Sequence, residues 1–183
     1  NRGVARVYKL LKNYRNDGEW VQIGSDIYGN VNNSYGGSAV SINSIGDIIA
    51  VASRGEANQY SSSGTTRVYY LNGSTWTVQG TLHGVASNEY SGENPQSISL
   101  NKDGTILAVG AYSNDTPYTD CGEVRIYEFS SGSWSLRDTI NGDGYNLRSG
   151  WAVSLNDAAD RVIIGAPYYN SYRGRVYIWS YNG

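Results

Sequence analysis

Thr66-Arg67-Val68-Tyr69 sets the period of this chain, because three close copies of the stretch occur elsewhere in the sequence. The copies follow one another at steps of about 61, 58 and 50 residues: Ala5-Arg6-Val7-Tyr8, the stretch above, Val124-Arg125-Ile126-Tyr127 and Gly174-Arg175-Val176-Tyr177. Each of the first three copies is followed by a turn rich in Gly, Asn or Ser and then by a tryptophan, namely Trp20, Trp76 or Trp134. A strand, a polar turn and a second strand predict a β-hairpin.

A second hairpin follows the first in every repeat. Its first strand alternates apolar and polar residues and its second strand is almost continuously apolar, in the pairs 38–43 with 47–52, 96–101 with 105–111, and 151–156 with 161–167. Alternation indicates one buried face, whereas a strand without polar positions is expected to be covered on both faces. Small residues such as Gly110 and Gly165 then permit a close approach of two backbones. Each repeat of roughly 58 residues therefore predicts one four-stranded antiparallel sheet.

Composition supports an all-β protein. The 183 residues are 39% hydrophobic and include 23 glycines, a mixture that favours strands joined by tight turns. The formal net charge of −2 offers no basic surface for nucleic acid, and no apolar run is long enough for a membrane span. One cysteine and one histidine allow neither an internal disulfide nor a metal site of two Cys and two His. The chain begins Asn1-Arg2-Gly3, without an initiator Met or signal peptide, which we interpret as a processed product or a fragment.

The third copy of the second hairpin resembles a known repeat. Gly150-Trp151-Ala152-Val153-Ser154-Leu155 with Val162-Ile163-Ile164-Gly165-Ala166-Pro167 is similar to FG-GAP repeats, the blades of integrin-α-type β-propellers. The resemblance covers nearly the whole chain and implies a propeller-like array of tandem four-stranded antiparallel blades. Many blades of that family carry a calcium loop between these two strands. The corresponding turns here, at 43–47, 101–104 and 156–160, supply too few carboxylates for a shell of six to eight oxygens, and tight-turn chemistry accounts for them.

The strand count predicts an array of about three blades that is incomplete at both ends. Units 1–37, 38–95, 96–150 and 151–183 of one repeat domain hold 13 strands in all, whereas three blades need twelve, and three blades are too few to close a ring. Either the chain is a fragment of a longer array or separate chains complete one another. The open edges for such contacts are expected at Val4, Arg6, Val7, Tyr8, Arg175, Val176, Tyr177 and Trp179.

We therefore expect a non-enzymatic structural or adhesive protein of the extracellular space or cell surface. Its open edges would bind other copies of itself or other extracellular proteins by strand addition, for example head to tail in a filament. A hydrolase or lyase is disfavoured, because no nucleophile with its base or pair of carboxylates is evident.

A glycan-binding module like a propeller lectin is the alternative. Tyrosine suits sugar stacking because it combines a large apolar area with a hydroxyl group, and packing of one blade on the next is the other use for such residues. The tyrosines in the variable loops are Tyr14, Tyr28, Tyr35, Tyr60, Tyr90, Tyr112, Tyr118, Tyr145, Tyr168, Tyr169 and Tyr172.

Few other side chains suggest chemistry. The densest acidic cluster is Asp115, Asp120 and Glu123; we interpret it as a solvated loop, with a bound calcium ion as the alternative. His83 is interpreted as a polar loop residue and Cys121 as a small buried residue. No cofactor is expected besides that calcium.

Two further sets of residues are the candidate glycosylation sites and the arginines of the repeated strand. Sequons that would accept N-glycans in a secreted glycoprotein begin at Asn32, Asn72 and Asn114. The arginine of the repeated strand recurs at one phase, so we expect it to make the same structural contact in each blade, an ion pair or a stack on an aromatic ring: Arg6, Arg67, Arg125 and Arg175.

Overall fold

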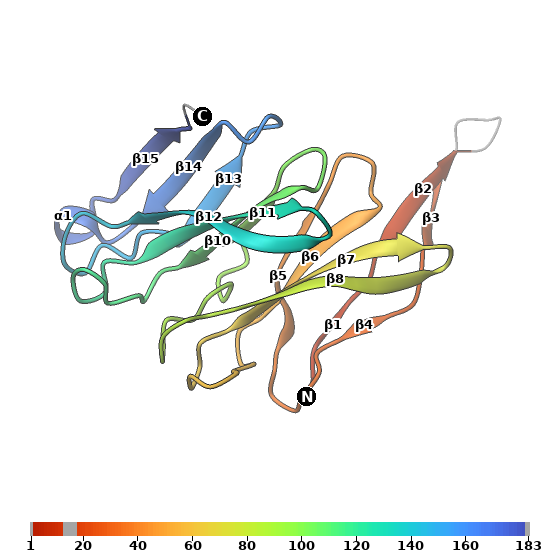
Figure 1. Cartoon of the computed structure of the whole chain (residues 1–183), viewed down its shortest axis with the longest axis horizontal. Coiled ribbons are helices and arrows are strands. Elements are labelled where there is room, and N and C mark those ends of the chain that lie inside the picture. The colour runs from red at the N-terminus through yellow and green to blue at the C-terminus, as the bar shows by residue number, and fades with distance from the viewer. Residues whose placement is uncertain (1, 13–17, 182–183) are drawn as a thin grey trace.

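The computed structural model describes residues 2–12 and 18–181, and these residues form an all-β structure of antiparallel sheets (Figure 1). Two sheets have four strands each, in the orders β5-β6-β7-β8 and β9-β10-β11-β12. Their bounds are Gly36–Ile42, Ile48–Ser53, Thr65–Asn72 and Thr75–His83 for the first, and Ile98–Leu100, Ile106–Ala111, Glu123–Ser130 and Ser133–Asn141 for the second. The expected pair of complete four-stranded units is confirmed.

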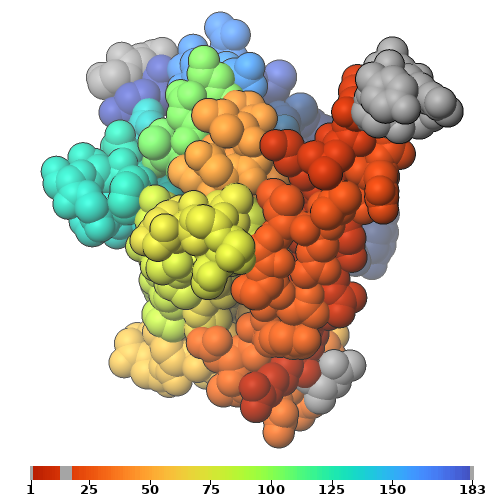
Figure 2. Space-filling model, turned by 90° about the vertical axis from the view of Figure 1, so that its right-hand side faces the viewer, coloured from red at the N-terminus to blue at the C-terminus, as the bar shows by residue number. Residues whose placement is uncertain are grey.

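The ends of the array hold smaller sheets. The last sheet has the three strands β13 (Ala152–Leu155), β14 (Arg161–Ala166) and β15 (Arg175–Ser180). At the other end, β1 (Val4–Ala5) pairs with β4 (Ile27–Tyr28), and β2 (Tyr8–Lys12) pairs with β3 (Gly18–Gln22). If β1 with β2 and β3 with β4 are each counted as one interrupted strand, the described residues contain the 13 predicted strands. Figure 2 shows the red strands of this N-terminal hairpin at the surface of the molecule.

The core lies in three apolar layers between successive sheets. The first layer joins the N-terminal hairpin to the β5–β8 sheet, the second joins β5–β8 to β9–β12, and the third joins β9–β12 to the last sheet. Strand β10 is buried at every position and β6 at all but its first, as expected for strands covered on both faces. Strand β14 instead alternates buried and exposed residues, because no sheet among the described residues covers its second face.

The turns between the first and second strands depend on an asparagine at the same phase in each sheet. The Asn43 side-chain oxygen accepts hydrogen bonds from three backbone N–H groups, those of residues 46, 47 and 48, at 3.0 to 3.1 Å. The Asn101 oxygen accepts from Thr105 and Ile106, and the Asn156 oxygen accepts from Arg161. This is the local side-chain capping that Asn provides in tight turns.

Neighbouring sheets are also tied together through their first strands. The Ser41 Oγ accepts a hydrogen bond from the Leu100 backbone N–H at 2.9 Å, and the Ser99 Oγ accepts one from Leu155 at 3.0 Å. The ideal Cβ of an alanine at Gly110 would lie 2.0 Å from the Gly150 carbonyl oxygen, so the predicted close backbone approach is present there. At the described residues, the one helical segment is α1 (Tyr169–Tyr172), and no helix is long and apolar enough to cross a membrane.

Candidate interaction site at the two open ends

The repeated Arg-Val-Tyr strand is covered in the two central sheets and exposed at the C-terminal end. Val68 on β7 and its counterpart Ile126 on β11 lie in apolar layers that join their sheets to the following sheet. Val68 is 0% exposed, whereas Val176, the same position on β15, is 61% exposed. Ile178, two residues further along the same face, is exposed as well. Val176 and Trp179, two of the residues expected at an open edge, are exposed. That they bind a partner stays a prediction.

The N-terminal hairpin exposes the opposite half of the same kind of contact. The tyrosine of the repeated strand packs on the preceding sheet, and Tyr69 and Tyr127 are both buried. Tyr8, their counterpart, is exposed, and so is Trp20 on the adjacent strand of the same face. Of two other residues expected at this edge, Val4 is exposed, whereas Val7 packs against the first apolar layer.

Each central tryptophan sits on a glycine of the preceding sheet. A Cβ at Gly24 would lie 2.4 Å from the Trp76 indole nitrogen, and a Cβ at Gly80 would lie 2.4 Å from Trp134 Cδ1. Trp76 is 6% exposed and donates its N–H to the Ile23 carbonyl, whereas Trp20 is 66% exposed. The tryptophans of this phase are therefore packing residues in the two central sheets, and the first copy is left uncovered.

A groove of about 460 Å³ lies beside the edge of β1 and β2 that pairs with no other strand in the described part of the chain. Its apolar wall on the β5–β8 sheet includes Val40 and Ile42, which are 57% and 50% exposed. The same positions in the next sheet, Ile98 and Leu100, are buried in the second apolar layer. The groove is thus the position at which the first two strands of a complete N-terminal sheet would lie.

A smaller groove of about 110 Å³ lies between β12 and the last sheet, where a fourth strand of that sheet would run. Its lining includes Arg137, Asp138, Trp179 and Tyr181, and the Arg137 guanidinium stacks 3.6 Å from the centre of the Tyr181 ring. Asp138 stands at the phase of the glycines that receive the central tryptophans, four residues after Trp134. A tryptophan entering this groove therefore meets a carboxylate instead of a glycine.

The recurring arginine forms an ion pair in all four copies, which is one of the two contacts that the sequence left open. Two of the pairs are buried and two lie at the surface: Arg67 with Glu56, Arg125 with Glu89, Arg6 with Asp26, and Arg175 with Asp143. In the two exposed pairs, hydrogen bonds lower the pKa of the carboxyl, from Arg6 in the case of Asp26 and from Tyr177 in the case of Asp143. Arg175 also stacks over the rings of Tyr169 and Tyr177.

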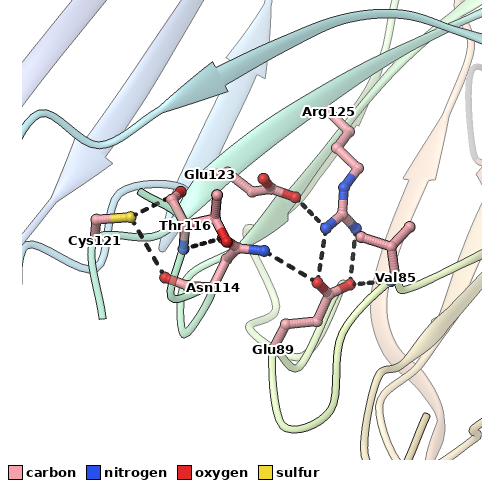
Figure 3. A network of polar contacts seen from close by, with 7 residues as sticks. All are labelled: Val85, Glu89, Asn114, Thr116, Cys121, Glu123 and Arg125. Carbon is pink, nitrogen blue, oxygen red and sulfur yellow. Dashed lines mark hydrogen bonds and ion pairs between the residues drawn. The ribbon is translucent and has the colours of Figure 1, made fainter. Parts of the chain in front are cut away.

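The buried pair of the second complete sheet is the centre of a polar network (Figure 3). Arg125 donates two hydrogen bonds to Glu89, at 2.8 and 2.7 Å, and also contacts Glu123. Glu89 further accepts from the Val85 backbone N–H and from the Asn114 amide. Burial raises the pKa of Glu123 because desolvation of its charge outweighs the attraction of Arg125. The network joins two loops to β11, and no groove described above reaches it.

The acidic cluster predicted as a calcium alternative is not assembled. Glu123 turns inward to Arg125, whereas Asp115 and Asp120 stay in the loop, where Asp115 accepts a hydrogen bond from the Asp120 backbone N–H. Among the described residues, no group of three or more His, Cys, Asp or Glu side chains is placed to hold a metal ion. The expected buried position of Cys121 is confirmed, and burial raises the pKa of its thiol.

Two of the three sequons lie on exposed turns, and the third is a correction. Asn32 and Asn72 are exposed. Asn114 is buried, with its amide bonded to Glu89 and its side-chain oxygen bonded to the Thr116 backbone N–H, so it cannot accept a glycan in the folded chain. The prediction that His83 is a loop residue was wrong: it is the last residue of β8, opposite Thr65, and its Nδ1 lies 3.0 Å from the Thr65 hydroxyl oxygen.

The loop tyrosines gather at one end of the sheets. Tyr14 is outside the described residues and Tyr28 ends β4. The other nine lie at the junctions that connect the second to the third strand or one sheet to the next, and antiparallel order brings these junctions to the same end. A ladder runs along it: Arg54 stacks over Tyr35 and pairs with Glu93, which accepts a hydrogen bond from Tyr112. Tyr112 then packs against Trp151.

Sequence reasoning missed the residues that complete these contacts. The partners of the repeated arginines, Glu56 and Glu89, lie in loops outside the repeated strand. Glu89 is also far from Arg125 in sequence, so the pattern of the strand does not point to it. Val40 and Ile42 were read only as half-buried strand positions. The detectable signal was their phase, since their counterparts Ile98 and Leu100 occupy the same place in the next repeat.

Comparison with known proteins gives a fold likeness without a family. No protein-family model matches the chain, and no curated protein matches its sequence. Among solved structures, the chain is similar to a protein described as a putative 6-phosphogluconolactonase from Bacteroides uniformis, with a TM-score of 0.55 at 9% identity. The match covers 96% of this chain and 49% of that protein, so the chain spans about half the length of its neighbour. The resemblance to FG-GAP repeats stays a prediction.

This comparison corrects the expectation of a non-enzymatic protein. A neighbour with a similar fold is described as an enzyme, so the fold gives no reason to exclude catalysis, and the inference from a sparse set of catalytic side chains was wrong. At 9% identity the likeness shows the fold alone, and the lactonase description belongs to the neighbour.

Proposed function

We propose that this chain is a self-associating sheet-array protein, in which the open C-terminal end of one copy binds the open N-terminal end of a second copy head to tail. The observation that carries the proposal is that the two ends expose the two halves of one internal contact. Positions buried between the central sheets are exposed at Val40, Ile42 and Tyr8 on one end and at Ile163 and Val176 on the other.

The internal contact gives the expected pairing of these residues. Ala50 on β6 packs with Ile98 and Leu100 of the following sheet. Ile163 on β14 is the counterpart of Ala50. Ala50 lies opposite Ser41 of its first strand, and Ile163 lies opposite Ser154, the serine at the same phase. Ile163 of one copy would accordingly meet Val40 and Ile42 of the next. Burying such side chains contributes about 1.5 to 3 kcal/mol each relative to exposure.

A polar contact repeats in the same way. The serines of the first strands accept backbone hydrogen bonds from the following sheet at Ser41 and Ser99. Ser154 is the third member of this series and is exposed. In the proposed assembly its hydroxyl accepts from the Ile42 backbone N–H of the second copy, since Ile42 is the counterpart of Leu100 and Leu155.

Trp20 supplies the anchor of the second copy. In the completed sheet its strand would run beside β12, and its ring would enter the groove at Arg137 and Asp138. Because Asp138 stands in place of a glycine, the Trp20 ring cannot pack on the backbone as the central tryptophans do. The Asp138 carboxylate can instead accept a hydrogen bond from the indole N–H. Exposed aromatic anchors that fill a pocket on a partner are typical centres of protein interfaces.

The finer architecture is part of the same proposal. We propose that the sheets are blades arranged about an axis lined by β5, β9 and β13, in the manner of a β-propeller. Contacts between β5 and β9 and between β9 and β13 support this order. The exposed sequons Asn32 and Asn72 support an extracellular or cell-surface location, and other extracellular proteins with complementary strand edges are possible partners on the same argument.

Sedimentation velocity of the 183-residue chain over a wide range of concentration tests the association. Val40→Asp and Ile163→Asp each place a charge in the proposed contact and should leave the protein monomeric. Val85→Asp is the control, because the Val85 side chain is similarly exposed (55%) in the loop between β8 and β9, and the hydrogen bond to Glu89 comes from its backbone N–H, which the substitution keeps. A mixture of Val40→Asp and Ile163→Asp retains one intact contact and should form heterodimers that grow no further. A wild-type chain that is monomeric at every concentration would exclude the proposal.

Glycan binding is the second candidate, favoured by one feature of the tyrosine-rich end. A pocket of about 420 Å³ there is lined by Tyr35, Arg54 and Glu93, an aromatic face beside charged hydrogen-bonding groups. A glycan array probed with the wild type and with Tyr35→Ala would test it. Loss of signal in the variant supports this candidate, and a wild-type array without signal removes it.

A further inference from the structure

Two strands of the chain compete for one position in the proposed assembly. Strand β15 is the third strand of the last sheet, and the β1–β2 strand carries the same Arg-Val-Tyr sequence as the third strand of the N-terminal sheet. A completed four-stranded sheet has room for one of them. Head-to-tail joining therefore requires either that β15 stay and β3 alone pair with it, or that β15 leave and the whole hairpin take its place.

The pairing of β15 differs from that of its counterparts. In the two central sheets, the arginine of the third strand lies opposite a valine of the second strand, as in Val51 with Arg67 and Val109 with Arg125. The corresponding residue of the last sheet, Ile164, lies opposite Tyr177. Strand β15 is thus paired two residues out of the register of the other sheets. A shift of two keeps each side chain on its own face, which is why the strand can still form.

The cause of the shift is visible in the connection and in the ion pair. The connection between the second and third strands spans residues 54–64 and 112–122 in the central sheets, but only 167–174 in the last, and loop length sets hairpin register. In the loop between β12 and β13, Leu147 stands where Glu89 stands in the loop between β8 and β9. Arg175 therefore lacks the buried partner of Arg125 and pairs with Asp143 at the surface. Exposed pairs of this kind contribute little to stability.

The N-terminal hairpin lacks these faults. Tyr8 lies opposite Gln22, which matches Tyr69 with Val78 and Tyr127 with Leu136. Its Arg6 has a partner within the hairpin, Asp26, in a two-bond contact at 2.9 and 2.8 Å. The hairpin therefore brings an in-register third strand, its own ion pair and a fourth strand together.

From this we infer that association proceeds by strand exchange: the N-terminal hairpin of a second copy displaces β15 from β14 and restores the register of the central sheets. The inference rests on the proposed head-to-tail function and specifies its interface. In the exchanged sheet, Arg6 of the second copy lies opposite Ile164 and Val4 lies opposite Ala166, as Thr65 lies opposite Ser53 within the β5–β8 sheet. The displaced β15 loses its hydrogen bonds to β14.

Two cysteine pairs separate exchange from simple addition. Val4→Cys with Ala166→Cys should form an intermolecular disulfide only if the hairpin pairs with β14, because opposite residues of antiparallel strands lie within disulfide reach. Gln22→Cys with Tyr177→Cys should form one only if β3 pairs with a retained β15. Within one copy the members of each pair lie on the first and last sheets, with two complete sheets between them. Dimers are read on non-reducing gels, and each single-cysteine variant, which keeps the buried Cys121, is the control.

Hydrogen exchange of the wild-type chain provides a readout that needs no substitution. Exchange predicts that the amides of β15 lose protection at concentrations where the chain associates, while those of β10 and β11 keep it. A disulfide through Val4 and Ala166 alone, with loss of β15 protection, supports strand exchange. A disulfide through Gln22 and Tyr177, with or without one through Val4 and Ala166, overturns strand exchange. Protection of β15 that is retained in an associated chain overturns it as well. Both results are compatible with head-to-tail association. A chain that never associates overturns the proposed function itself.

Discussion

The third strands of the central and last sheets share a sequence motif but not an environment. Arg125 on β11 is held by a buried bidentate contact to Glu89, and Ile126 beside it packs into the following sheet. Arg175 on β15 forms a surface pair with Asp143, and Val176 is exposed. The difference teaches that the motif encodes a strand and an ion pair, whereas the following sheet and the loop of the preceding one determine how much stability it contributes.

The largest expected contrast is between the two ion pairs. Glu89→Gln leaves the Arg125 charge buried without its bidentate partner, and breaking a buried pair in this way costs about 3 to 5 kcal/mol. Asp143→Asn removes a mostly exposed partner and should cost less than about 1 kcal/mol. Urea denaturation of the two variants measures both. Equal losses would mean that burial does not distinguish the central sheet from the last.

The tryptophans give the next contrast. Trp76→Ala empties a buried seat on Gly24 and should lower the free energy of unfolding by about 3 kcal/mol or more. Trp20→Ala, at an exposed position, should change the stability of the monomer by less than about 1 kcal/mol. The same variant should weaken association in sedimentation experiments. Association equal to that of the wild type would remove Trp20 from the interface.

The valines of the repeated strand show how much stability a covering sheet contributes. Val68→Ala deletes two methyl groups from a fully buried site and should cost about 2 kcal/mol, the transfer of these groups plus a small cavity. Val176→Ala should change monomer stability by less than about 0.5 kcal/mol. Thermal unfolding makes the comparison, in samples dilute enough to sediment as monomers. A large loss at Val176 would show that its face is covered in the monomer.

The smallest expected effect concerns Glu123, the second carboxylate of the buried network. Burial raises its pKa in the folded chain above the unfolded value, so the folded state binds this proton more tightly. Its stabilising contribution is present below the unfolded pKa of about 4.3 and is lost as the pH rises through the folded pKa. Relative to wild type, Glu123→Gln should therefore gain stability as the pH rises from 4 to 7, because the variant has no carboxylate that must ionise in a buried site. Denaturation at both pH values measures the difference, and a relative loss at pH 7 would contradict the sign.

Much of the fold could be predicted from the sequence because its signals are local and repeated. The strands followed from the period of the Arg-Val-Tyr motif and from alternation, and the turns followed from asparagines such as Asn43. The recurrence of Arg67 and Arg125 at one phase indicated a structural contact, either an ion pair or a stack on an aromatic ring, and in both cases it is an ion pair. The partners could not be predicted, since Glu56 lies in the loop before β7 and Glu89 reaches Arg125 from the loop between β8 and β9.

The sites diverged where long-range contacts decide. Asp115, Asp120 and Glu123 are neighbours in sequence, but Glu123 begins a strand whose face points to Arg125, and the other two stay in the loop. Asn114 satisfies the sequon pattern, yet the fold buries it beside Glu89. Adjacent sequence places residues near one another along the chain, whereas strand faces and loop docking determine which side chains meet.

By itself, the sequence determined that these 183 residues are an array of repeated antiparallel hairpins. Periodicity and turn residues act over a few positions, and they suffice for that. The tertiary structure decided which copies of the repeated strand are covered, how the register of β15 shifts, and which positions that are buried in the central sheets are exposed in the first and last ones. These depend on loop length and on the presence of a neighbouring sheet, which no single repeat contains.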